Sequence, residues 1–242
     1  MTIAIQTFRR LSRLVFDEAD GPLPVFLVGL TILTGMVDAL SVLRLGEVFV
    51  ANMTGNIVFL GFDVAGVAGF SASVHLTALA AFILGAAVGG RLGAAFGHHR
   101  GRLIAVVAAA KCGFASTAVC ISLLMAQPDA PGLRYALIGL LATSMGLQNA
   151  AVRHLRTPDL TTTVLTGTIT ALASDLAVAG GNAGQLIRRV LSALLLFIGA
   201  ATGAVILQLA GITALLLVNL VLVACIAAGA FRLWSSQEPW TR

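Results

Sequence analysis

Long apolar runs, separated by short polar or glycine-containing stretches, fill most of the chain. Eight apolar segments can be marked, at about residues 23–43, 48–70, 74–96, 103–125, 133–152, 160–181, 190–209 and 212–232. They are rich in Ala, Leu, Val, Ile and Gly and lack the alternation of polar and apolar residues that barrel strands show. Most approach the roughly 20 residues that a helix needs to cross a bilayer. The pattern therefore predicts an all-α integral membrane protein.

Composition agrees with this class. Hydrophobic residues make up 58% of the chain and charged residues only 10%, whereas a soluble domain has about a quarter charged residues. The net charge of +5 is explained by the excess of basic residues in cytoplasmic loops of membrane proteins. We therefore expect a lipid bilayer as partner and no nucleic acid.

The basic loops argue against eight full crossings. With a cytoplasmic amino terminus, eight crossings would place the loops at 98–102 and 153–156 outside, against the positive-inside bias. If segments 48–70 and 160–181 instead enter and leave by the same face, these loops and both termini become cytoplasmic. The charges thus predict six full transmembrane helices plus two re-entrant or broken half-helix segments. Whether these two segments cross the membrane stays open.

The same two segments carry a repeated polar motif. The stretch 52–65 aligns with 164–177, and the matching pairs are Thr54 with Thr166, Gly55 with Gly167, Ile57 with Ile169 and Asp63 with Asp175. Further matches pair Gly35, Asp38 and Ala39 with Gly146, Asn149 and Ala150, and Gly85 and Gly89 with Gly199 and Gly203.

These matches divide the chain into two repeat units. The first spans 23–126 and the second 133–232, between a basic tail at 1–22 and a carboxyl tail at 233–242. Three full crossings per unit is an odd number, so the units would be inverted relative to each other, as in many transporters. The alternative is a duplication that serves only the stability of the bundle.

Each repeated segment has the features of an extended arm followed by a half-helix. Thr54 and Asn56 are candidates to cap the first helix start, and Thr166 or Thr168 the second. A helix start presents unpaired amide hydrogens and partial positive charge, which suit an anion or a polar solute. The predicted substrate-binding residues are Asn52, Thr54, Gly55, Asn56, Gln148, Asn149, Thr166, Gly167 and Thr168. The alternative is that these side chains only satisfy backbone groups at a kink.

Asp38 is the candidate for proton coupling. A carboxylate within a membrane span is costly unless it is neutral, paired or hydrated, and its counterpart in the second unit is the uncharged Asn149. One unit would thus supply a titrating group and the other a fixed amide. The alternative is an ion pair between Asp38 and Arg44 near the outer interface.

Other polar residues carry weaker signals. We expect Lys111 to extend its stem toward the interface, and the pair His98 and His99 to belong to a basic loop rather than a metal site. The chain shows no catalytic triad, phosphate-binding loop or paired-cysteine motif, so we expect no enzyme activity, no metal and no cofactor. The small-residue pairs Gly85/Gly89 and Gly199/Gly203 permit close helix packing within one chain or in a homodimer.

Four strings resemble the YoaK-like family of bacterial membrane proteins, which carry a domain of unknown function. They are residues 35–39 (Gly-Met-Val-Asp-Ala), 46–56 (Gly-Glu-Val-Phe-Val-Ala-Asn-Met-Thr-Gly-Asn), 146–150 (Gly-Leu-Gln-Asn-Ala) and 158–163 (Pro-Asp-Leu-Thr-Thr-Thr). The resemblance covers about residues 25–232. It implies a location in the bacterial inner membrane and about six spans, and it implies no substrate or reaction.

The sequence therefore predicts a small secondary transporter or facilitator for a small polar or anionic solute. The solute would bind at the bilayer midplane between the two Thr-Gly half-helix starts, with Asp38 as a candidate proton carrier. A passive channel and a non-transporting scaffold or signalling protein remain as alternatives.

Overall fold

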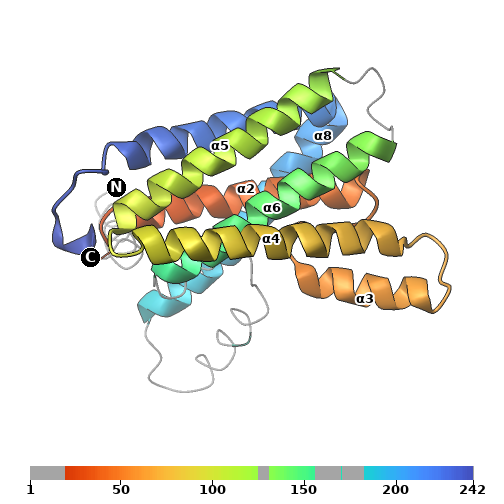
Figure 1. Cartoon of the computed structure of the whole chain (residues 1–242), viewed down its shortest axis with the longest axis horizontal. Helices are drawn as coiled ribbons and strands as arrows, with labels where there is room; N and C mark the ends of the chain where they lie inside the picture. Colours follow the sequence, from red (N-terminus) through yellow and green to blue (C-terminus); the bar gives the residue numbers. More distant parts are fainter. Residues whose placement is uncertain (1–19, 125–130, 156–169, 171–182, 242) are drawn as a thin grey trace, which may run out of the picture.

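A computed structural model describes residues 20–124, 131–155, 170 and 183–241. Its helices are α2 (Leu23–Arg44), α3 (Met53–Val64), α4 (Ala72–Phe96), α5 (Arg100–Leu124), α6 (Pro131–Leu155) and α8 (Ala183–Phe231), followed by the short 3₁₀ helix η2 (Pro239–Thr241) (Figure 1). The described residues form helices and no strand, which confirms the all-α prediction. Residues 1–19 of the basic tail and almost all of the second Thr-Gly segment lie outside the described residues.

Five helices are long and apolar enough to cross a membrane. The last of these, α8, has 49 residues and a helix length of about 73 Å, more than twice the hydrocarbon thickness. It is broken at Gly211, whose φ of 81° and ψ of −175° are accessible almost only to glycine. The prediction of two apolar segments at 190–209 and 212–232 therefore agrees with the break.

Contacts at its two ends show that α8 crosses the bundle twice. The part of α8 near its start lies beside the start of α2, because Arg188 donates a hydrogen bond of 2.8 Å to Asp20, three residues before α2 begins. Just after Gly211, the Thr213 hydroxyl contacts that of Ser122 near the far end of α5. Its second half then returns to the side where it began, as Figure 1 shows. With α2, α4, α5 and α6, the described residues make six passages through the bundle.

The helix termini gather at two ends of the bundle. At the Arg44 end, the hydroxyl of Tyr135 at the start of α6 hydrogen-bonds Ser73 at the start of α4 (2.7 Å). At the His98 end, the carboxyl tail folds against the junction of α4 and α5, where Arg102 Nε donates to the carbonyl of Trp234 (3.2 Å). Passages that follow one another in the sequence therefore alternate in direction, whereas α4 runs parallel to α6, and α2 runs parallel to the first half of α8.

The most buried span is α2. Its leucines Leu23, Leu27, Leu30 and Leu33 follow helical spacing and belong to one apolar cluster with residues of α5, α6 and α8. Three- and four-residue spacing places side chains on one face of a helix. Helix α2 therefore lies in the apolar core of the bundle, together with residues of α5, α6 and α8.

Backbone contact through glycine fixes α2 against α8. A Cβ atom added at Gly35 would overlap the carbonyl oxygen of Leu196, and one added at Gly199 would overlap that of Ile32. One turn further along α8, a Cβ at Gly203 would lie 2.8 Å from the Cα of Met36. Only glycine permits this close approach.

The crossing of α4 and α6 has the same pattern. A Cβ at Gly146 would overlap the carbonyl oxygen of Phe82, and one at Gly85 would overlap that of Thr143. A Cβ at Gly89 would lie 2.9 Å from the Cα of Leu147. The sequence alignment pairs Gly146 with Gly35, Gly85 with Gly199 and Gly89 with Gly203. The two crossings are therefore made by corresponding glycines. The small-residue pairs are therefore used within the chain.

The short helix α3 lies beside α4. It has 12 residues, a length of about 18 Å that is too short to cross a bilayer. It begins near the middle of α4 and ends toward the Arg44 end, as Figure 1 shows. The non-helical stretch 45–52 leads from the end of α2 to the start of α3. The chain thus runs from the Arg44 end toward the middle of the bundle as a non-helical stretch, and it runs back toward the Arg44 end as α3.

Asn56 holds this inward stretch against α3. Its Nδ2 donates to the carbonyl of Phe49 at 2.6 Å, and its Oδ1 accepts from the amide of Phe49 at 2.9 Å. The helix begins at Met53 after Asn52, and no side chain caps its start. The expectation that Thr54 or Asn56 caps the helix is therefore wrong, because the Asn56 amide pairs with main chain seven residues earlier.

We predict that Asn56→Ala destabilises the protein much more than Asn52→Ala. Asn56 is buried and satisfies two main-chain groups of Phe49, and each buried group left unpaired costs about 1–3 kcal/mol. Asn52 is exposed and forms no capping bond. Thermal unfolding of both variants in detergent measures the difference. Equal melting temperatures would contradict the role given to Asn56.

We also predict that residues 44 and 68 lie on one face of the membrane, and residues 98 and 232 on the other. Single cysteines would replace Arg44, Ala68, His98 and Arg232, which are exposed, in a background lacking the native cysteines Cys112, Cys120 and Cys225. Labelling with an impermeant maleimide from each side of sealed vesicles gives the result. Labelling of positions 44 and 68 from opposite faces would show that residues 45–67 cross the membrane.

Candidate functional site

A cavity of about 1390 Å³ lies where α2, α3, α4, α6 and α8 meet. Its polar lining residues are Asp38, Asn52, Thr54, Asn149, Arg153 and His154. Its other lining residues are Phe49, Ala51, Met53, Gly55, Val58, Phe59, Phe82, Ala86, Gly90, Ala150 and Leu196. Polar groups thus share the cavity with a largely apolar wall.

The cavity brings together five of the predicted site residues. Asp38 comes from α2, Asn149 from α6, and Asn52, Thr54 and Gly55 from the start of α3. These positions are separated by up to about a hundred residues in the sequence. Thr166, Gly167 and Thr168 lie outside the described residues, so their part in the site remains a prediction.

Asp38 is held by the inward stretch before α3. Its Oδ1 accepts a hydrogen bond of 3.3 Å from the amide of Ala51. In the part of the chain that the structure describes, the ion pairs are those of Asp20 with Arg100 and Arg188. The alternative of an ion pair between Asp38 and Arg44 is therefore not found there.

The start of α3 forms one side of the cavity. Residues Asn52 to Gly55 line it, and no side chain caps the helix. The first amides of a helix have no partner within the helix and carry partial positive charge. This side of the cavity can therefore donate hydrogen bonds from the main chain to a bound solute.

Gln148 lies outside the cavity, in the core between α2 and α6. It is fully buried, and its Nε2 donates to the Thr34 hydroxyl at 3.1 Å. One turn earlier on α6, Ser144 accepts a hydrogen bond of 3.2 Å from Lys111 Nζ. Lys111 is only 4% exposed, so the expectation that it extends to the interface is wrong. These residues form a buried polar contact between α2, α5 and α6.

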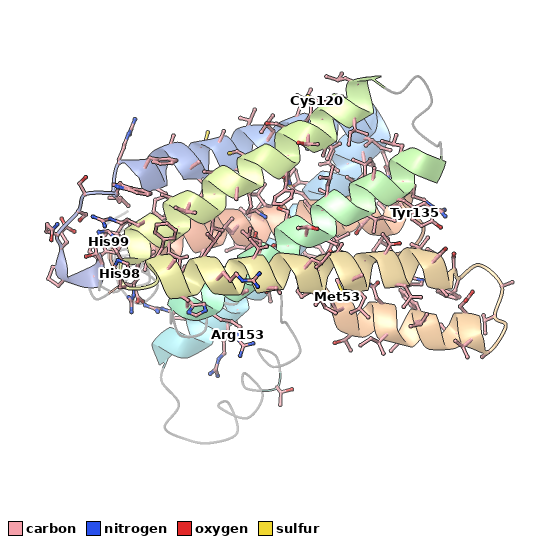
Figure 2. The ribbon with its side chains drawn as sticks, viewed as in Figure 1. Met53, His98, His99, Cys120, Tyr135 and Arg153 are labelled. Carbon is pink, nitrogen blue, oxygen red and sulfur yellow. The ribbon has the colours of Figure 1, made fainter. Side chains whose placement is uncertain are left out.

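Arg153 and His154 are cavity residues that the sequence prediction missed. They were assigned to a loop because α6 was expected to end at 152, but the helix continues to Leu155. Arg153 thereby falls one helical turn after Asn149, on the same face. Figure 2 shows Arg153 pointing away from the bundle, on the same side of α4 as Met53. That four-residue spacing is the signal that identifies it.

Three aromatic rings were also missed. Phe49 and Phe59 stack at a centroid distance of 6.0 Å, and Phe82 contributes from α4. Aromatic residues in apolar segments are usual in a membrane protein, so their position in the cavity has no separate sequence signal. Together they contribute aromatic side chains to the cavity lining.

Comparison with known proteins places the chain in a family. A family model described as "Protein of unknown function (DUF1275)" matches residues 26–228. The chain is also 33% identical over 149 residues to "UPF0700 transmembrane protein YoaK" of Bacillus subtilis (strain 168), a match covering 61% of this chain and 64% of that protein. No solved structure matches. The chain therefore belongs to the DUF1275 family of membrane proteins, as its resemblance to YoaK-like proteins predicts.

Proposed function

We propose that this protein is a small secondary transporter or facilitator for a small polar or anionic solute. The observation that carries the proposal is the cavity that joins Asp38, the uncapped start of α3 and Asn149. Polar groups inside a membrane bundle are costly, and they gather in this way where a solute or ion passes. No catalytic role is proposed for any of them.

An inverted repeat is the second part of the proposal. Its support is the pair of glycine crossings, in which Gly35 and Gly199 meet as Gly146 and Gly85 do. In an inverted repeat, the two units are related by an axis in the membrane plane. A helix of the first unit then contacts the second unit as its counterpart in the second unit contacts the first. Asp38 and Asn149 then follow Gly35 and Gly146 by three residues each, on opposite sides of that axis.

We further propose that α3 and the stretch before it form a re-entrant segment. The supporting facts are the short length of α3, its start near the middle of α4 and the hydrogen bonds of Asn56 to Phe49. A half-helix that starts within the membrane directs its positive end at the solute. The corresponding second segment falls outside the described residues.

The orientation follows from the distribution of basic residues. Arg100, Arg102 and Arg188 belong to the His98 end of the bundle, which we assign to the cytoplasm on the positive-inside rule. Both termini would then be cytoplasmic, in a bacterial inner membrane.

Asp38 is the proposed proton carrier. A charged carboxylate beside a bound anion would repel it, whereas a protonated Asp38 would not. Binding of an anionic solute together with a proton avoids this repulsion, so the two would move together. The Ala51 amide supports the charged form when the solute leaves.

We predict that Asp38→Asn abolishes uphill transport but keeps exchange. Purified protein in liposomes would be tested with phosphate, lactate, glycerol and benzenesulfonate as labelled probes. In the wild type, a proton gradient should drive accumulation of the transported probe by up to about tenfold per pH unit for one proton per solute. The variant should still exchange internal for external probe and show no accumulation.

Asp63→Asn is the matched control, because Asp63 belongs to α3 but not to the cavity lining, and it should accumulate probe like the wild type. Retained accumulation in Asp38→Asn would exclude Asp38 as the carrier. An ohmic current would identify a channel, and the lack of any flux through folded protein would favour a scaffold.

A further inference from the structure

The cavity has room for a molecule larger than an inorganic ion. Small-molecule pockets usually have volumes of about 300–1000 Å³, and this cavity has about 1390 Å³. An inorganic anion such as phosphate would fill a small part of it and leave the aromatic wall facing water. The cavity can therefore accommodate an organic molecule.

The aromatic lining residues indicate the chemical character of the part of the ligand that they would contact. The stacked rings of Phe49 and Phe59 come from the inward stretch and α3, and Phe82 comes from α4. Gly90 adds no side chain, and a Cβ there would meet nothing within 4 Å. Rings prefer to pack against other flat or apolar groups. The cavity thus offers apolar and aromatic side chains against which an apolar body can pack.

Arg153 supplies a charge for the other end of such a molecule. It is an exposed side chain among the cavity lining, one turn after Asn149, and its end is directed away from the bundle (Figure 2). Among the described residues no carboxylate pairs with it, because the ion pairs found there are those of Asp20. A guanidinium presents a planar set of donors that binds carboxylates and sulfonates through two parallel hydrogen bonds. Asn149 and His154 provide further polar groups beside it.

We infer that the solute is an organic anion with an apolar body, and that Arg153 binds its anionic group while Phe49, Phe59 and Phe82 contact its body. This rests on the proposed function for the idea that a solute enters the cavity. It goes further in assigning Arg153, a residue otherwise explained by the positive-inside rule, to solute binding. It also separates the solute from inorganic anions and from neutral polar molecules.

Binding of matched probes tests the inference without requiring transport. The purified full chain in detergent would be titrated with sulfate, methanesulfonate, benzenesulfonate and 2-naphthalenesulfonate, which share negatively charged sulfur–oxygen groups and differ in apolar area. Benzenesulfonamide and benzyltrimethylammonium give the neutral and cationic counterparts. Thermal stabilisation should saturate and strengthen from methanesulfonate to 2-naphthalenesulfonate, and sulfate, the sulfonamide and the cation should give little.

Variants identify the residue that binds the anionic group. Arg153→Gln should weaken benzenesulfonate binding by about tenfold or more, since a charged hydrogen-bonded contact is lost, and Arg153→Lys should lie between. Arg91→Gln is the matched control, because Arg91 is exposed on α4 next to Gly90 but does not line the cavity. It should bind like the wild type. Melting temperatures without ligand show that each variant is folded.

Several results would overturn the inference. They are equal binding of sulfate and benzenesulfonate, preference for the neutral or cationic probe, unchanged affinity in Arg153→Gln, or no saturable binding to the wild type. Binding as expected without flux in liposomes would instead refute transport and leave the organic-anion site standing. Uphill transport that does not depend on Arg153 would support transport and refute the organic-anion site.

Discussion

Backbone contact between helices at glycine is the constraint on which this structure depends. In lipid, apolar side chains gain little by packing on one another rather than on acyl chains, so close packing and hydrogen bonds must hold helices together. Here two crossings do so, α2 with α8 at Gly35 and Gly199, and α4 with α6 at Gly146 and Gly85. Each crossing brings main chain against main chain, and a single methyl group would force the helices apart.

The two crossings also explain where the polar groups lie. Asp38 follows Gly35 by three residues and Asn149 follows Gly146 by the same number, so each lies about one turn beyond a crossing. The cavity includes residues of both helix pairs and is bounded in addition by the start of α3. The same packing that stabilises the bundle thus places a carboxylate, an amide and a helix start around one space.

Hydropathy and loop charge predicted much of this fold. Helix positions followed from apolar length, and the gap between the last two segments coincides with the break at Gly211. The alignment of Gly35 with Gly146 named the glycines that make the crossings. Asp38, Asn149 and the residues before and after Met53 were also identified, because polar residues stand out in apolar sequence.

The residues whose positions or contacts the sequence did not predict have physical explanations. Lys111 was expected near the interface, since its Ser144 partner on another helix leaves no trace in local sequence. Asn56 bonds the main chain of Phe49, and such a bond depends on a turn that the pattern does not specify. Arg153 was assigned to a loop because the end of α6 was placed three residues early, and helix ends are the least certain part of any sequence-based assignment.

The equivalence of the two crossings can be measured by replacing Gly35, Gly199, Gly146 and Gly85 with alanine one at a time. Unfolding in detergent would be compared with Gly139→Ala, where a Cβ meets nothing within 4 Å. All four substitutions should destabilise the protein by comparable amounts, about 1–3 kcal/mol or more, whereas Gly139→Ala should be neutral or slightly stabilising. If one crossing tolerates alanine while the other does not, the two contacts are not equivalent and the shared cavity loses its structural basis.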